Sequence, residues 1–136
     1  MEFLKQNVLL IGLAIGSGLT LLWPMLSRSV AGISALSVTE AVMLMNRKSA
    51  LVLDVRDAEE FAQGHLQGAR HVPLAQLGAS LNTLEKYRDK PVLLVCQRGN
   101  RARTAAKLLK AQQFTQLHVL KGGMQDWLAA NMPTSK

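Results

Sequence analysis

The stretch VLLVCQRGNRARTAAKLLK, residues 92–110, decides the fold. Four apolar residues lead into Cys96, a short loop rich in arginine and glycine follows, and a helical pattern begins near Ala102. A short apolar run of this kind predicts a strand buried on both faces of a sheet. The order strand, loop, helix therefore places Cys96 at the carboxyl end of a strand that we expect to be central.

Strand and helix patterns alternate along most of the chain on both sides of this stretch. This alternation predicts an α/β domain, with a mostly parallel central sheet and helices on both of its faces. In such a sheet the ligand site lies at the carboxyl ends of the strands, where Cys96 is expected. The expected strands lie within residues 31–35, 50–55, 69–74, 92–96 and 117–120, and the expected helices begin near Ser37, Asp57, Leu77, Ala102 and Met124.

The composition excludes several classes of site. The chain has 136 residues, a net charge of +7 and a single cysteine, so an internal disulfide framework and a multi-cysteine metal site are excluded. His65, His71 and His118 do not have the spacing of metal ligands. Positive charges are mixed with acidic residues and there are few aromatics for base stacking, which disfavours binding to DNA or RNA. In the loop after Cys96, in contrast, the neighbouring charged residues are all positive.

The amino-terminal segment differs from the rest of the chain. Residues 6–27 carry no charge, and about 20 such residues span a bilayer as a helix. We expect residues 1–30 to be a transmembrane anchor with a linker, in a single-pass, bacterial inner membrane protein; a cleaved signal peptide is the alternative. The count of Lys and Arg on either side, and the unpaired thiol, favour a cytoplasmic domain over a periplasmic one. Gly12 and Gly16 have helix-pairing spacing, which suggests a weak helix-mediated dimer.

The surroundings of Cys96 favour a reactive thiol. Backbone N–H groups at a helix start have no partner within the helix, and the helix dipole adds partial positive charge there. Gly99 allows the loop to turn its N–H groups inward as an anion nest. A thiolate, or an anionic substrate, is stabilised in such a cradle, and Arg98, Arg101 and Arg103 add permanent charge. The alternative is a buried, inert cysteine beside solvated arginines.

Three motifs resemble those of the rhodanese family. CQRGNR, residues 96–101, is similar to that family's six-residue active-site loop. LDVRDAEEFAQGHLQGARHVPL, residues 53–74, resembles its upstream signature, and GGMQDW, residues 122–127, its closing motif. The likeness covers residues 34–133 and departs from the family at Ala102, where many members have Ser or Thr. It implies a rhodanese-like fold for this domain.

The resemblance also implies a function. The family's sulfurtransferases accept sulfur on the active-site cysteine, so Cys96 is the expected catalytic nucleophile, forming a persulfide. The donor is a small anion such as thiosulfate, and the acceptor is cyanide in an assay or a thiol or protein in the cell. No metal or organic cofactor is implied. The expected substrate-binding residues are those of the loop: Gln97, Arg98, Gly99, Asn100, Arg101 and Ala102.

Two other functions stay open. A non-catalytic rhodanese module would bind a partner protein at the membrane. A small cysteine phosphatase or arsenate reductase uses a similar loop, but the phosphatase pattern has five residues between cysteine and arginine, and only four separate Cys96 from Arg101.

Four residues of the family motifs are expected to be structural. We interpret Asp54 and Arg56 as a polar pair that organises the loops, and His65 as a hydrogen-bonded residue of the fold. Trp127 is expected in the core.

Overall fold

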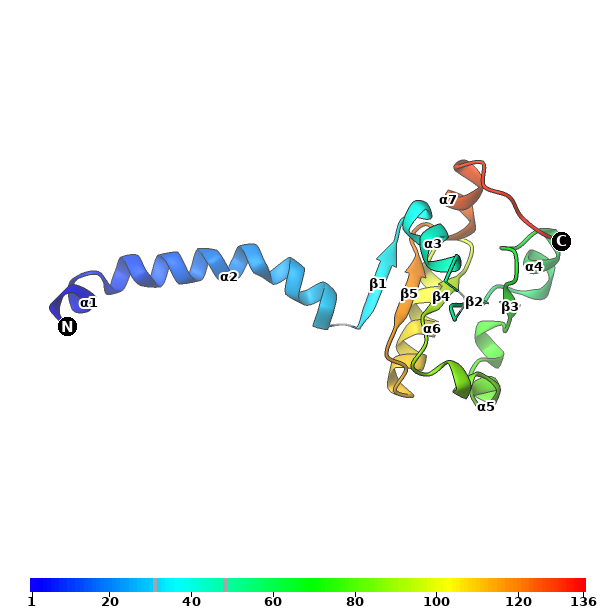
Figure 1. Cartoon of the computed structure of the whole chain (residues 1–136), viewed down its shortest axis with the longest axis horizontal. Coiled ribbons are helices and arrows are strands. Elements are labelled where there is room, and N and C mark those ends of the chain that lie inside the picture. Colours follow the sequence, from blue (N-terminus) through cyan, green and yellow to red (C-terminus); the bar gives the residue numbers. More distant parts are fainter. Residues whose placement is uncertain (31, 48) are drawn as a thin grey trace. The chain divides into compact units, whose positions relative to one another are not determined.

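The computed structural model describes residues 1–30, 32–47 and 49–136, with the side chains of residues 23–30 left out. The chain forms two compact units, Met1–Ala31 and Gly32–Lys136, both drawn in Figure 1.

The first unit contains the helices α1 (Glu2–Gln6) and α2 (Val8–Val30), which are separated at Asn7. Within the described residues, neither these nor any other helix combines the length and apolarity that a membrane crossing requires. On this finding the predicted transmembrane helix over residues 6–27 and the membrane localisation are wrong; the side chains of residues 23–27 lie outside the described ones.

The second unit is built on a five-stranded sheet with the order β1-β5-β4-β2-β3 (Figure 1). All pairings between these strands are parallel, which confirms the predicted α/β class. The strand β4 lies in the middle, between β5 and β2, as expected for the strand that leads into Cys96. The bounds are β1 (Ile33–Leu36), β2 (Leu51–Asp54), β3 (Arg70–His71), β4 (Val92–Val95) and β5 (Leu117–Leu120).

Helices cover both faces of the sheet, as predicted. Successive residues of β4 point to opposite faces, so Leu94 packs in the cluster that contains Leu109 of α6, whereas Leu93 packs in the cluster that contains Leu44 of α3 and Trp127 of α7. The helices are α3 (Val38–Met45), α4 (Ala58–Gln63), α5 (Leu81–Leu84), α6 (Asn100–Ala111) and α7 (Gly123–Ala129), with 3₁₀ turns at Leu74–Gln76, Gly78–Ser80 and Glu85–Tyr87.

Several predicted boundaries are wrong, for local reasons. The strand expected over residues 69–74 contains only Arg70–His71, because Pro73 has no N–H to continue the ladder. The helix expected from Leu77 is broken into α5 and short 3₁₀ turns. The helix α6 begins at Asn100, earlier than expected, because Gly99 adopts a left-handed φ of 105° and turns the chain directly into the helix.

Candidate functional site

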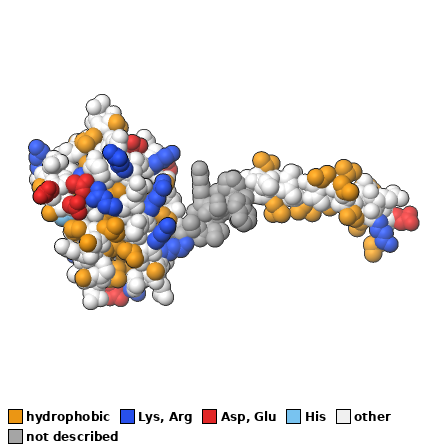
Figure 2. Space-filling view, turned by 180° about the vertical axis from the view of Figure 1, so that it is seen from behind, with side chains coloured by type: hydrophobic (Ala, Val, Ile, Leu, Met, Phe, Trp, Pro, Cys, Tyr) orange, Lys and Arg blue, Asp and Glu red, His pale blue; other side chains and the backbone are white. Residues whose placement is uncertain are grey.

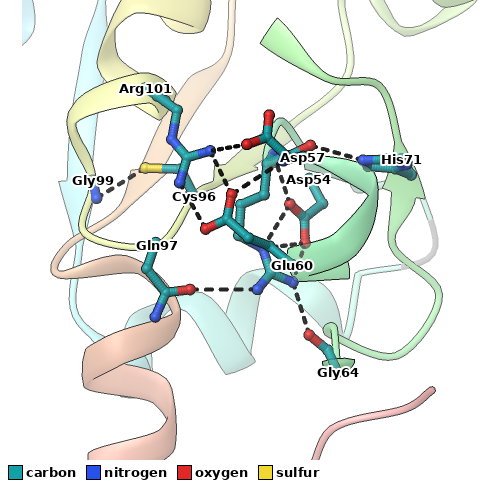
Figure 3. A network of polar contacts seen from close by, with 10 residues as sticks. Asp54, Asp57, Glu60, Gly64, His71, Cys96, Gln97, Gly99 and Arg101 are labelled. Carbon is teal, nitrogen blue, oxygen red and sulfur yellow. Dashed lines mark hydrogen bonds and ion pairs between the residues drawn. The ribbon is translucent and has the colours of Figure 1, made fainter. Parts of the chain in front are cut away.

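Cys96 follows β4 at the carboxyl end of the sheet and is 1% exposed. Only Gln97, Arg98 and Gly99 separate it from the first residue of α6. The N–H of Gly99 donates a hydrogen bond of 2.9 Å to Cys96 Sγ (Figure 3). The sulfur therefore lies at the start of α6, where the helix dipole and loop amides favour a negative charge.

The loop after Cys96 is held in place by the start of α7. The carbonyl oxygens of Cys96 and Gln97 accept hydrogen bonds of 2.9 and 3.1 Å from the N–H groups of Met124 and Gln125. Gly123 allows this approach: its φ is 57°, and a Cβ there would collide with the carbonyl of Cys96 and lie 2.7 and 2.8 Å from the carbonyl carbon and oxygen of Gln97. Because N–H and C=O point in opposite directions across a trans peptide, the N–H groups that follow these carbonyls point away from α7.

Arg101 is paired with Glu60 across the mouth of the site. Its Nη1 and Nη2 donate hydrogen bonds of 2.7 and 2.9 Å to the two carboxylate oxygens of Glu60, and Asp57 Oδ2 lies 4.0 Å from Nη1 (Figure 3). The hydrogen bonds from Arg101, aided by the N–H of Asp57, lower the pKa of Glu60 to about 2. The same pairing raises the pKa of Arg101. The positive charge of Arg101, which we expected to bind an anionic substrate, is thus partly balanced by Glu60.

A buried ion pair between Asp54 and Arg56 supports the floor of the site, which confirms the predicted polar pair. Arg56 Nε donates to both carboxylate oxygens of Asp54, at 3.0 and 3.1 Å, and Nη2 donates to Asp54 Oδ2 and to the carbonyl of Gly64, both at 2.8 Å. Arg56 Nη1 lies 3.5 Å from Gln97 Oε1, and the carbonyl of Arg56 is 2.8 Å from His71 Nε2. This network links the ends of β2 and β3 to the residue after the cysteine.

A cavity of about 460 Å³ opens at Cys96 and is lined by Cys96, Gln97, Arg98, Asn100 and Arg101. The structure therefore brings four of the six predicted substrate-binding residues together around the sulfur. Gly99 contributes its N–H to Sγ, whereas the side chain of Ala102 is fully buried in the core beside the sheet. A smaller cavity of about 170 Å³ lies beyond Gln97 and has Arg56 and Glu60 in its wall.

Two of the residues that shape the site were not identified from the sequence as its members. Glu60 lies in the quoted motif of residues 53–74, but no role in the site was assigned to it, because its partner Arg101 is 41 residues away. Gly123 lies in the quoted motif of residues 122–127, but it was interpreted only as part of a turn. Two structural interpretations are confirmed: His65 Nδ1 lies 3.0 Å from the carbonyl of Phe61 and its ring stacks on Phe61, and Trp127 is 3% exposed.

These contacts define what the site can do chemically. A single thiol is held at a helix start, with one amide donor on the sulfur and further amides in the loop. Arg98 is exposed at the mouth of the cavity. The arrangement suits a nucleophilic cysteine that receives a small anionic group and holds a charged covalent intermediate.

Comparisons with known proteins agree on one family. The model of the rhodanese-like domain matches residues 37–130. An uncharacterized protein of Bacillus subtilis, YqhL, is 38% identical over 91 residues, which are 67% of this chain and 71% of that protein. The thiosulfate sulfurtransferase GlpE of Pseudomonas putida is 37% identical over 95 residues, 66% of this chain and 80% of that protein. The crystal structure of a rhodanese-related protein from Thermoplasma volcanium has a TM-score of 0.67 at 26% identity and covers 75% of this chain and 97% of that one.

Proposed function

The chain belongs to the rhodanese-like domain family, and on that premise we propose that it is a sulfurtransferase that carries sulfane sulfur as a persulfide on Cys96. The observation that supports this most is the position of the sulfur. Cys96 Sγ ends a central strand, accepts the N–H of Gly99 and opens into a cavity lined by its own loop. We assign the catalytic unit to residues 34–133.

The first step loads the cysteine. The thiolate of Cys96 attacks the outer sulfur of thiosulfate, and the bond between the two sulfur atoms of the donor breaks. The electron pair of that bond leaves with sulfite, so one anion and one dianion give a persulfide anion and a sulfite dianion. Arg98, exposed at the cavity mouth, attracts the donor; Arg101 adds less, because Glu60 neutralises much of its charge.

The second step transfers the sulfur from Cys96 to the acceptor. A thiolate or cyanide attacks the outer sulfur of the persulfide, and the bond to Sγ breaks with its electron pair returning to Cys96. Between the steps, the amide of Gly99 and the other amides of residues 97–102 stabilise the negative persulfide, in the manner of an oxyanion hole. The chemistry requires only the cysteine, the loop and the two substrates.

Formation of thiocyanate from thiosulfate and cyanide tests the proposal. The full chain is expected to catalyse it, and Cys96→Ala is expected to abolish it while the circular dichroism spectrum stays that of the folded protein. Retained thiocyanate formation in Cys96→Ala would refute the assigned nucleophile. No feature of the site favours the phosphatase alternative, because four residues separate Cys96 from Arg101 and Glu60 occupies that arginine.

A further inference from the structure

The exposed side of α6 carries positive charge away from the mouth of the site. Arg98 lies in the catalytic loop, and Arg103 and Lys107 are exposed on α6. Arg103 and Lys107 are four residues apart, so they lie on one side of the helix and extend about 10 Å from its start. We call these three residues the basic flank. Figure 2 views this unit from behind, and Lys and Arg side chains gather on the face that it shows.

Among the residues that the structure describes, no acidic side chain forms an ion pair with the basic flank. The sequence of α6, NRARTAAKLLKA, contains no acidic residue. In the described parts of the chain, the ion pairs of arginines involve Arg56, Arg88 and Arg101, and none reaches Arg103 or Lys107. The opposite side of α6 is buried at Ala102, Ala105, Ala106 and Leu109. The basic side chains therefore project from a helix whose opposite side is packed on the sheet.

The helix α6 also exposes an apolar side chain. Leu108, next to Lys107 in the chain, is 46% exposed, although it belongs to a helix whose other leucine, Leu109, is buried. Protein interfaces commonly combine apolar and charged side chains, and the exposed part of α6 carries both kinds. The scarcity of exposed aromatics, in contrast, provides no stacking platform for a nucleic acid.

The other side of the mouth has the opposite sign. Asp57 and Glu59 are exposed at the start of α4, and Glu60 is held by Arg101. In Figure 2, Asp and Glu side chains lie beside Lys and Arg side chains at the edge of the same face. A partner that is acidic around its reactive group is attracted to α6 and repelled from α4. The two surfaces of opposite charge therefore orient the partner and also increase its rate of association.

We propose that the basic flank docks a protein whose cysteine takes sulfur from Cys96 and lies in an acidic surface. This inference rests on the proposed sulfurtransferase activity and names the acceptor class. Cys96 is almost fully buried, so an acceptor thiol must enter through the cavity past Arg98. Contact with Arg103 and Lys107 holds the acceptor there during the attack on the outer sulfur.

The test uses the full chain and two synthetic peptides of about 15 residues, each with one cysteine. One peptide has Asp and Glu around the cysteine, and the other has Ser and Gln. Cys96 is loaded with radiolabelled sulfur, and transfer to each peptide is timed at low and at high salt. The double variant Arg103→Glu/Lys107→Glu is compared with Lys86→Glu/Lys90→Glu, which makes the same change of net charge at exposed positions before β4, at the opposite end of that strand from Cys96.

The wild type is expected to label the acidic peptide about tenfold faster than the neutral one at low salt, and this ratio should fall at high salt. In Arg103→Glu/Lys107→Glu the ratio should fall to the ratio of the two peptides' intrinsic thiol reactivities or below it, and in Lys86→Glu/Lys90→Glu it should persist. Comparing ratios removes the difference in intrinsic reactivity between the peptide thiols.

Three results would overturn the proposal: an unchanged ratio in Arg103→Glu/Lys107→Glu, an equal loss in both double variants, or tighter binding of a single-stranded oligonucleotide than of the acidic peptide. Failure of the sulfurtransferase proposal is distinguishable, because Cys96 would then take no label in any variant. In that case, the fluorescence anisotropy of the acidic peptide with Ser in place of Cys still measures docking. Equal binding of this peptide to the wild type and to Arg103→Glu/Lys107→Glu would contradict the proposed docking surface, whatever the result for sulfur transfer.

Discussion

The carboxylate of Glu60 and the guanidinium of Arg101 form an ion pair with two hydrogen bonds, of 2.7 and 2.9 Å, that joins α4 to the first turn of α6 beside Cys96. Arg101 is the last residue of the motif CQRGNR that begins at Cys96, so this pair holds the loop and at the same time reduces the positive field over the sulfur. The pair therefore provides separate predictions for affinity and for stability.

Replacing Glu60 by Gln should lower the KM for thiosulfate about two- to fivefold, with a smaller change in kcat. The substitution removes the charge that competes with the donor for Arg101, and a partly exposed ion pair is worth up to about 1 kcal/mol. Glutamine also keeps an oxygen that can accept the N–H of Asp57 at the helix start. Glu59→Gln, an exposed neighbour on α4, is the matched control. A KM that is unchanged or raised in Glu60→Gln would show that Arg101 does not respond to the donor.

The stability that this pair contributes should depend on pH in one direction. The pKa of Glu60 is about 2 in the folded protein and about 4.3 in an unfolded chain. A lowered carboxyl pKa stabilises the fold above the unfolded pKa, and the contribution is lost as the pH falls from about 4 toward 2. Urea unfolding of the wild type and Glu60→Gln should therefore differ by a constant free energy above about pH 5 and converge below pH 4. A difference that stays the same down to pH 2.5 would refute the assignment.

Gly123→Ala should destabilise the protein by about 2 kcal/mol or more and reduce sulfur transfer. An alanine there adopts a left-handed φ and collides with the backbone of Cys96 and Gln97. Gly68→Ala is the matched control, because Gly68 has a φ of 75° but a Cβ added there would meet no atom within 4 Å. Thermal unfolding should give a lower Tm for Gly123→Ala than for Gly68→Ala. An equal fall in Tm for the two variants would mean that the contact between α7 and the loop does not contribute to stability.

Asp54→Asn should be among the more damaging polar substitutions, at about 3–5 kcal/mol, because it leaves the buried guanidinium of Arg56 without its counter-charge. Glu85→Gln removes the partner of Arg88 in an exposed pair at 3.4 Å and should cost less than about 0.5 kcal/mol. Chemical denaturation of both variants measures the contrast. Comparable small losses would indicate that the buried network does not organise the end of the sheet.

The sequence was sufficient for features that depend on local patterns. The apolar run into Cys96 predicted a central buried strand, and Ser37 and Glu40 predicted a helix start that the structure confirms with reciprocal hydrogen bonds of 3.2 and 3.3 Å. The class of the fold followed from the alternation of such segments. These features could be predicted because each is determined by neighbouring residues.

Features that depend on distant contacts or on a single backbone angle could not be predicted. The pairing of Glu60 with Arg101 needs the packing of α4 beside α6, and the early start of α6 follows from the φ of Gly99. The transmembrane prediction relied on the absence of charge over residues 6–27. The described helices do not reach the combination of length and apolarity that a membrane crossing requires.

The central claim is that Cys96 carries sulfur, and the intact mass of the full chain after treatment with thiosulfate tests it most directly. We expect the mass to rise by that of one sulfur atom, the addition to map to the peptide that contains Cys96, and cyanide or dithiothreitol to remove it. Cys96→Ser should gain nothing under the same conditions. A folded wild-type protein whose mass does not change after exposure to thiosulfate and to small persulfides would contradict the account.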